Sequence, residues 1–199
     1  MASKEPAKPG LREMTRRAVR LQIAEAAMAL FVQQGFEETT VDEIAAEVGI
    51  SSRSIFRYFP TKEDIVVGHL DEIGDKLAAA LEARPVDEAP WVALRHAMRP
   101  HLDDLATRAD SMLATALMLS SAPALRGPLL NKRARWTELL LPNVMLRLKG
   151  PPRTREVQAR AIVSAALACL NTAVDEWERS GGTESVDQLL DLAIEAVRN

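Results

Sequence analysis

The sequence predicts an all-α fold. Aromatic residues make up only 4% of the 199 residues, whereas 27% are charged, a balance that favours helices over sheets. Apolar residues recur three or four positions apart through most of the chain, and prolines and glycines separate these stretches. Together these observations predict about nine helices, in a chain long enough for two modest domains.

The clearest local signals lie between Thr40 and Lys62. Thr40, with Glu43 three residues later, has the sequence of a capping box, so we expect a helix to begin at Val41. We expect Gly49 to end this helix, because a residue without Cβ adopts the left-handed conformation at little steric cost. A short helix followed by a tight turn is therefore predicted here.

A second short helix follows this turn. Ser51 or Ser52 is placed to cap it, and Pro60 ends it because the proline ring removes a donor. Ile55 and Phe59, four residues apart, are its inward anchors. Its other face carries groups able to reach phosphates or base edges: Ser52, Arg53, Ser54, Arg57 and Tyr58. The pair of helices has the pattern of a DNA-reading helix-turn-helix.

A longer helix is predicted to precede this pair. It begins between Arg12 and Arg17, ends at Gln34 and is closed by Gly35. Its buried face is predicted to be Ile23, Ala27, Leu30 and Phe31. The result is a three-helix DNA-binding unit of the homeodomain-like kind. The alternative is a plain three-helix bundle without a nucleic-acid partner.

The opening of the chain is basic. Its cationic residues outnumber Glu5 and Glu13; they are Lys4, Lys8, Arg12, Arg16, Arg17 and Arg20. A basic arm ahead of a helix-turn-helix suits phosphate or minor-groove contact, and the alternative for residues 1–10 is a solvated tail. We interpret residues 1–13 as a basic, disordered arm.

Residues 16–66 also resemble a known family, the TetR-type bacterial transcriptional regulators. The resemblance is carried by Ile23-Ala24-Glu25-Ala26-Ala27, Leu30-Phe31, Gly35-Phe36, Thr39-Thr40, Ile44-Ala45, Val48-Gly49-Ile50-Ser51, Tyr58-Phe59 and Lys62-Glu63. It implies a DNA-binding domain over residues 14–60 and a helical effector-binding and dimerisation domain over residues 61–199. It also implies that the helix predicted at 61–83 transmits ligand occupancy to the DNA-reading unit.

The resemblance also assigns DNA contacts. Base reading is expected from Ser52, Arg53 and Arg57, since arginine to guanine is the commonest specific pairing. Phosphate contacts are expected from Thr40, Ser54, Tyr58 and Lys62, with Arg17 or Arg20 reaching the backbone or minor groove. Lys62 lies in the first turn of its helix, the unfavourable end for a cation, which indicates an anionic partner. Phe56 departs from the family pattern, which usually has a phosphate-binding tyrosine there.

Further helices are predicted in the second half of the chain, over residues 91–108, 112–121, 129–149, 156–180 and 185–197. The nearly uncharged helix 112–121 is expected to be buried on most sides. Helix 156–180 carries small residues that would let another helix approach closely: Ala161, Ala165, Ala168 and Thr172. In the resembled family the last two long helices pair with a second subunit. The resemblance thus implies a homodimer that binds a near-palindromic operator.

Large or flexible apolar residues in the middle helices predict a hydrophobic effector pocket, because methionine adapts to varied shapes. The predicted ligand-binding residues are Trp91, Met98, His101, Met112, Met118, Trp136 and Met145. The apolar members would serve equally well in an ordinary helical core. His101, with Arg99, is the candidate polar anchor.

No pattern in the sequence indicates an enzyme, a metal site or a cofactor. The histidines His69, His96 and His101 lack metal-ligand spacing, and no glycine-rich phosphate loop or nucleophile elbow occurs. The single cysteine, Cys169, precludes an intramolecular disulfide and indicates a reducing compartment. The longest uncharged stretches are too short to span a bilayer. We therefore expect a cytoplasmic protein without catalytic residues or a membrane partner.

These observations lead to one hypothesis and its alternatives. The chain is predicted to be a homodimeric, ligand-responsive transcriptional regulator, a repressor released from a palindromic operator by a small lipophilic effector. Residues 160–192 resemble an actinobacterial subgroup, some of whose members respond to long acyl-thioesters. One alternative is a helical ligand-binding or adaptor protein whose DNA-reading unit does not function. Another is activation rather than repression.

Overall fold

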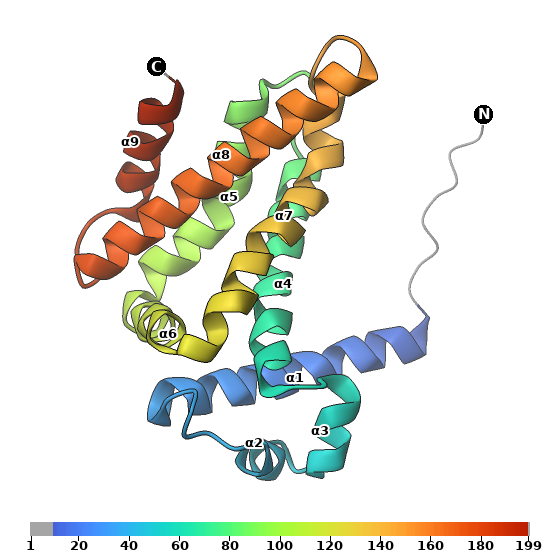
Figure 1. The fold of residues 1–199 in the computed structure, drawn as a ribbon, viewed down its shortest axis with the longest axis vertical. Helices are drawn as coiled ribbons and strands as arrows, with labels where there is room; N and C mark the ends of the chain where they lie inside the picture. The colour runs from blue at the N-terminus through green and yellow to red at the C-terminus, as the bar shows by residue number, and fades with distance from the viewer. Residues whose placement is uncertain (1–9, 199) are drawn as a thin grey trace. The chain divides into compact units, whose positions relative to one another are not determined.

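A computed structural model describes residues 10–198. In these residues it contains nine α-helices, one short 3-10 helix and no strand, which confirms the predicted all-α fold (Figure 1). The helices are α1 (Leu11–Gln34), α2 (Val41–Val48), α3 (Ser52–Tyr58), α4 (Lys62–Glu82), α5 (Pro90–Thr107), α6 (Ala109–Ser121), α7 (Arg126–Leu146), α8 (Pro152–Arg179) and α9 (Val186–Arg198), with η1 (Pro123–Leu125) before α7. The chain divides into two compact units, one ending at His69 and the other beginning at Leu70.

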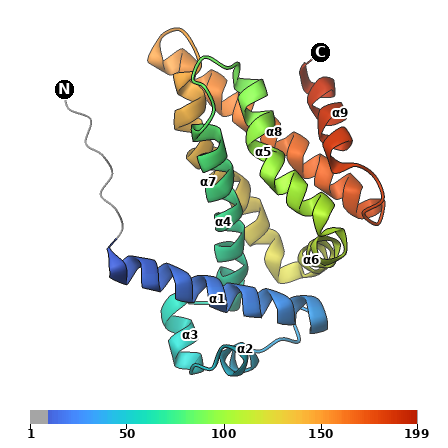
Figure 2. The same ribbon diagram turned by 180° about the vertical axis from the view of Figure 1, so that it is seen from behind.

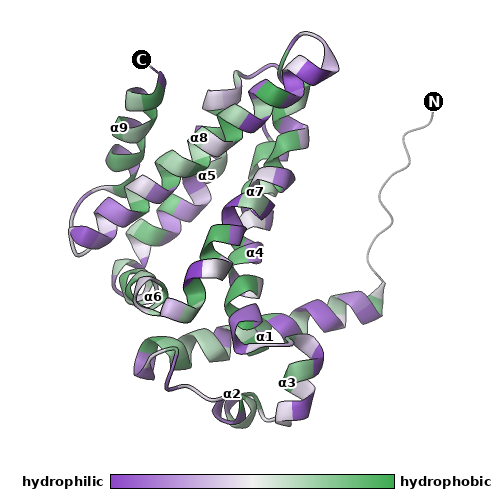
Figure 3. Cartoon of the chain, viewed as in Figure 1, coloured by the Kyte–Doolittle hydropathy of each residue, from purple (hydrophilic) through white to green (hydrophobic). Residues whose placement is uncertain are grey.

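The first unit is built from α1, α2, α3 and the start of α4. Helix α1 begins earlier than expected, because the amides of Glu13 and Met14 already bond the carbonyl of Gly10 at 2.8 and 3.1 Å. Residues 11–13, which we assigned to a disordered arm, are therefore helical. Gly10 is the N-cap of α1, and residues 1–9 of that predicted arm lie outside the described residues. Figure 3 shows that hydrophilic residues gather in the N-terminal half of α1.

The predicted capping box of α2 is confirmed. Thr40 Oγ1 accepts from the Glu43 amide at 3.2 Å, and Glu43 Oε2 accepts from the Thr40 amide at 2.8 Å. These bonds, led by the one from the Thr40 amide, lower the pKa of the Glu43 carboxyl. Gly49 ends α2 in the left-handed conformation with φ 75°, and the hydroxyl of Ser51 caps α3. Local sequence thus fixes both ends of the turn that orients α3.

In the second unit, α8 is the central helix. It packs along α7 on one side and α9 on the other, and it also contacts α5 and α6 (Figures 1 and 2). By length and composition alone α8 is apolar enough to cross a membrane. Its buried side chains, among them Val163, Leu167, Leu170 and Trp177, belong to the hydrophobic core of this unit. Burial in a helical core accounts for the apolar character of that face.

The prediction for residues 112–121 was wrong. Of the residues of α6, only Met118 is fully buried, and Leu117 is 49% exposed. The residues of α6 were expected to be buried because they carry almost no charge. Instead this helix borders a cavity on one side and solvent on another, so low charge did not mean burial here.

Helix α9 is held by a charged clamp as well as by apolar contacts. Arg95 of α5 donates to Asp187 and Asp191 of α9, each at 2.6 Å. These hydrogen bonds, the one to Asp191 first, raise the pKa of Arg95. Val186 and Leu190 of α9 are buried against the core. The clamp joins residues more than ninety positions apart, so the sequence carried no local signal for it.

A pH-dependent contribution to stability is expected from Glu88. This carboxylate accepts from Arg84 at 2.6 and 2.9 Å and contacts His96 Nδ1 at 3.1 Å, and the Arg84 bonds chiefly lower its pKa from 4.5 to about 2. Because the folded pKa lies below the unfolded value, the contribution is present above pH 4.5 and is lost as the pH falls toward 2. Glu88→Gln should therefore be less stable than wild type near neutral pH, and the difference should shrink in acid.

Urea unfolding of both proteins across this pH range would measure the effect. Glu82→Gln, at an exposed glutamate of α4, is a matched control. Its difference from wild type in free energy of unfolding should not show this dependence on pH. If the loss of stability in Glu88→Gln stayed constant between neutral pH and pH 3, the stabilising role assigned to the Glu88 carboxylate would be contradicted.

Candidate DNA interface and effector cavity

The exposed face of α3 carries Arg53, Phe56 and Arg57. The serines beside them are occupied: Ser52 Oγ donates to Asp42 of α2, and the hydroxyls of Ser54 and Ser51 lie 2.9 Å apart. The first bond ties the start of α3 to α2, and the second lies within the start of α3 itself. The arginines remain the longest exposed polar side chains of this helix. Of the predicted base-reading residues, Arg53 and Arg57 lie four positions apart on this helix and therefore share a face.

Lys62 has partners within its own unit. Its ammonium donates to the carbonyls of Phe36 at 2.6 Å, Thr39 at 2.9 Å and Glu37 at 3.3 Å, and lies 4.3 Å from the Phe36 ring centroid. We inferred an anionic partner from a cation at the wrong end of a helix. The structure supplies a different partner, the connection between α1 and α2. Phosphate binding by Lys62 stays a prediction.

Arg20 is also engaged inside the unit. Its Nη1 donates to the Tyr58 carbonyl at 2.5 Å, and its guanidinium stacks 4.2 Å from the Phe59 ring centroid. The bond satisfies a carbonyl at the end of α3, where intrahelical partners run out. Arg20 thereby helps to position α3. Arg17, the other candidate on α1, is exposed and has an interaction of its own.

A basic groove between α1 and α3 was not predicted as a site. It has a volume of about 470 Å³ and is lined by Leu11, Arg12, Thr15, Arg16, Arg57 and Tyr58. Arg12 and Arg16 are four residues apart on α1, which places both on one helix face. That spacing was the available signal, although we counted Arg12 and Arg16 only among the basic residues at the opening of the chain. Thr40, another predicted phosphate contact, is exposed at the start of α2, and its hydroxyl is part of the capping box.

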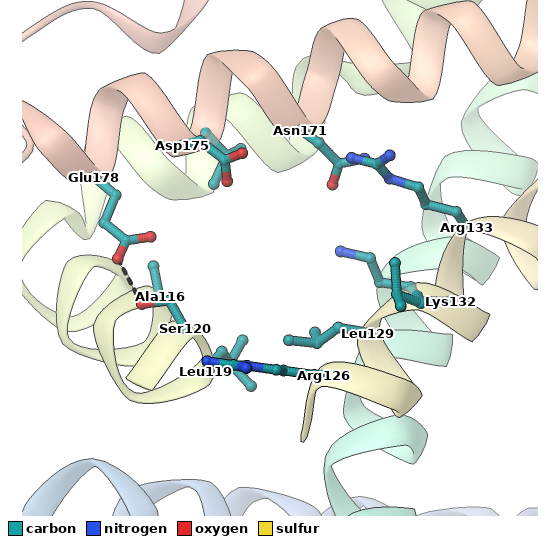
Figure 4. Close-up of a pocket in the computed structure, with 12 residues that line it drawn as sticks. Ala116, Leu119, Ser120, Arg126, Leu129, Lys132, Arg133, Asn171, Asp175 and Glu178 are labelled. Atoms are coloured by element: carbon teal, nitrogen blue, oxygen red, sulfur yellow. Dashed lines mark hydrogen bonds between the residues drawn. The ribbon is translucent and has the colours of Figure 1, made fainter. Parts of the chain in front are cut away.

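A cavity of about 490 Å³ lies between α6, α7 and α8 (Figure 4). Its apolar wall includes Leu119, Leu129, Leu130 and Val174. Its polar groups come from α6, α7 and α8: Ser120, Arg126, Lys132, Arg133, Asn171, Asp175 and Glu178. A mostly apolar hollow with a few convergent polar groups is the usual form of a small-molecule site.

None of the predicted ligand-binding residues lines this cavity. Met98, Met118 and Trp136 are buried in the core, and Met112 and Met145 pack partly buried against it. Trp91 lines a separate hollow between α5 and α9, and His101 is partly exposed on α5 with an interaction of its own. The residues that do line the cavity include charged side chains of α7 and α8. Helical periodicity assigns such residues to the solvent face, which is why they were missed.

Family models match most of the chain. Residues 23–67 match the model described as bacterial regulatory proteins of the tetR family, and residues 88–199 match the MftR C-terminal domain. The chain belongs to the tetR family. The resemblance predicted from the motif residues is thereby confirmed, and the tetR-family segment contains α2 and α3 in full.

Named relatives of this tetR-family regulator are transcriptional regulators. The chain is 30% identical to TcmR of Streptomyces glaucescens, over 97% of its own length and 88% of that protein. It is 27% identical to the transcriptional repressor AcnR of Corynebacterium diphtheriae, over 90% of this chain and 92% of that one. It is 24% identical to the putative mycofactocin biosynthesis regulator MftR of Mycobacterium tuberculosis, over 84% and 83%.

Solved structures confirm the tetR-family fold. FadR of Bacillus subtilis, in complex with stearoyl-CoA, aligns with a TM-score of 0.59 at 18% identity over 88% of this chain and 95% of that one. FadR of Thermus thermophilus, a repressor in complex with lauroyl-CoA, gives 0.58 at 20% identity over 88% and 91%. At this identity the likeness concerns the arrangement of helices and leaves the ligand of this chain open.

Proposed function

We propose that this tetR-family regulator is a cytoplasmic homodimer that represses transcription from a palindromic operator and is released by a small lipophilic effector. The observation that carries the proposal is an exposed Arg53 and Arg57 face on α3, a helix that Ser51 caps at its start and Arg20 holds at its end. A cavity of effector size in the other unit supports the ligand response.

On DNA, Arg53, Arg57 and Ser52 are assigned to base edges in the major groove. The phosphate contacts are assigned to Thr40, Ser54, Tyr58, Lys62, Arg17 and Arg20. The basic groove between α1 and α3 adds Arg12 and Arg16 to this set. Phosphate contacts position a protein on the duplex while base contacts specify the sequence. Because Arg20 and Lys62 already bond protein carbonyls, their larger contribution is to hold the unit in shape.

Dimerisation through α8 and α9 is supported by what these helices expose. Ala161, Ala168 and Thr172 form an exposed stripe of small residues on α8, and Leu192 of α9 is 64% exposed. Small residues let two helices approach closely. A two-fold axis there would place two copies of α3 in successive major grooves, about 34–36 Å apart.

Ala168→Glu is expected to make the protein monomeric. A carboxylate at a close helix–helix contact is buried without a partner in both subunits, which costs several kcal/mol for each charge, so the dimer dissociation constant should rise by about a hundredfold or more. Sedimentation equilibrium would measure it. Ala79→Glu, at an exposed alanine of α4, is the matched control and should remain dimeric. An unaltered dimer in Ala168→Glu would place the interface elsewhere.

Effector binding has a physical route to the DNA-reading unit. Helix α7 lines the cavity and also contacts α4, where Arg135 pairs with Asp71 and the indole of Trp136 packs against Gly74. Helix α4 in turn begins at Lys62, in the first unit. A ligand that moves α7 therefore acts on α4 directly. To shift the population almost completely from the DNA-bound to the DNA-free conformation, the ligand's binding free energies for the two conformations must differ by about 5.5 kcal/mol.

The experiment that tests the proposal is in vitro selection of sheared genomic DNA on the purified protein, followed by sequencing, with Arg53→Ala in parallel. We expect a palindrome that the variant fails to enrich. If neither protein enriches any sequence at low salt, DNA regulation fails and a ligand-binding or adaptor role replaces it. Reporter transcription from the enriched site separates repression from activation.

A further inference from the structure

We infer that the effector is a hydrophobic anion whose acidic group binds Lys132 in the cavity between α6, α7 and α8. This inference rests on the proposed function, since it takes that cavity to be the effector site. It adds the chemical class of the ligand and the side chain that recognises it.

The charges around the cavity favour an anion. Its cationic side chains are Arg126, Lys132 and Arg133, whereas its acids are Asp175 and Glu178. Glu178 is partly satisfied within the protein, because its Oε1 accepts from Ser120 Oγ at 2.7 Å (Figure 4). Among the residues that the structure describes, Arg126, Lys132 and Arg133 form no ion pair. The wall therefore has an excess of positive charge that the protein itself does not neutralise.

Lys132 is the cation best placed to bind an anion in this cavity. Figure 4 shows its ammonium reaching into the space enclosed by the lining residues, and its Nζ lies 4.8 Å from the Trp136 ring centroid. Burial, and then repulsion by Arg133, lower the pKa of Lys132, while Asp175 acts in the opposite direction. A partly buried ammonium without a bonded carboxylate is costly, and a bound anion relieves that cost.

The remainder of the wall requires an apolar body on the ligand. Leu119, Leu129 and Val174 line the cavity, and Leu119 and Leu129 lie together in Figure 4, apart from Asn171. The side-chain amide nitrogen of Asn171 donates to the Leu167 carbonyl at 2.7 Å. The side-chain oxygen of Asn171 is left as an acceptor for a ligand. A volume of about 490 Å³ suits a drug-sized molecule. The ligand class that fits is an amphipathic acid, with the acid at Lys132 and the hydrocarbon against the leucines.

A pair of fluorescent probes tests the inference without knowledge of the natural effector. 8-Anilinonaphthalene-1-sulfonate and N-phenyl-1-naphthylamine have the same rings with and without an anionic group. Wild type should bind the sulfonate about tenfold more tightly than the neutral probe, the difference expected from one charge-assisted hydrogen bond. Lys132→Met, which keeps an apolar stem of similar length, should abolish this preference and retain the neutral probe.

Two further variants make the result specific. Lys149→Met, at an exposed lysine outside the cavity, should keep the full preference. Ala116→Trp, which fills the cavity from α6, should bind neither probe, while its circular dichroism spectrum should show that the protein is still helical. Equal affinity of wild type for the two probes, preference retained in Lys132→Met, or failure of both probes to bind would each overturn the inference.

Operator binding by the same proteins keeps this test separate from the proposed function. Lys149 lies in the second unit and outside the cavity, so Lys149→Met should bind the selected operator as wild type does. If operator binding is intact and the probe preference is absent, only the inference about the ligand fails. If no operator is selected although the probes bind as expected, the regulator proposal fails and the anion site stands.

Discussion

Replacing Arg53 with alanine should cost about 1–3 kcal/mol of binding free energy on the cognate operator and relax specificity at one base pair in each half-site. Arg53 is exposed on α3, and its guanidinium has the geometry for bidentate pairing with guanine. The loss should therefore depend on the base at one position. Anisotropy titrations against operators carrying each base pair at each position would measure it.

Lys62→Ala is the informative comparison, because its ammonium bonds the carbonyls of Phe36, Glu37 and Thr39. We expect this variant to weaken binding similarly on every sequence and to lower the thermal stability of the first unit. Arg99→Ala, at an exposed arginine of α5, should change neither property. Equal, sequence-independent losses for Arg53→Ala and Lys62→Ala would contradict the assignment of Arg53 to a base.

Where local sequence determines the structure, the fold was predictable. The capping box at Thr40, the left-handed Gly49 and the proline after Phe59 act within a few residues, and each has the predicted effect at the helix end it controls. The same local reasoning failed for Lys62, because its partners lie 23 to 26 positions earlier in the chain. A cation at the start of a helix looks unfavourable only until those carbonyls are in place.

The cavity could not be predicted for a related reason. Lys132 and Asp175 lie on different helices, and their approach to one space depends on how α7 packs against α8. On a single helix such residues have the pattern of a solvent face. Conversely, Met98 and Trp136 have the composition expected of a ligand pocket and are buried in the core instead. Side-chain type alone does not distinguish a hollow from a filled space.

Gly74→Ala should destabilise the protein by up to about 2 kcal/mol, even though alanine is the better helix former. Inside α4 the replacement would gain about 1 kcal/mol from helix propensity. Against this, a Cβ on Gly74 would lie 2.5 Å from Trp136 Nε1 and 2.6 Å from its Cδ1, and overpacking a core costs about 1–3 kcal/mol. Trp136 is only 4% exposed, so its rigid ring has little room to retreat.

Urea unfolding would measure the sign of this effect. Gly127→Ala on α7 is the matched control, since a Cβ there meets nothing within 4 Å, and it should be neutral or stabilising. Trp136→Phe, which removes the indole nitrogen, should reduce the penalty of Gly74→Ala in a double-mutant cycle. Because this contact joins α7 to α4, Gly74→Ala should also weaken release of DNA by the effector. A stabilised Gly74→Ala protein with normal release would mean that the contact between Trp136 and Gly74 does not couple α7 to α4, so that the signal must travel by the Arg135–Asp71 pair instead.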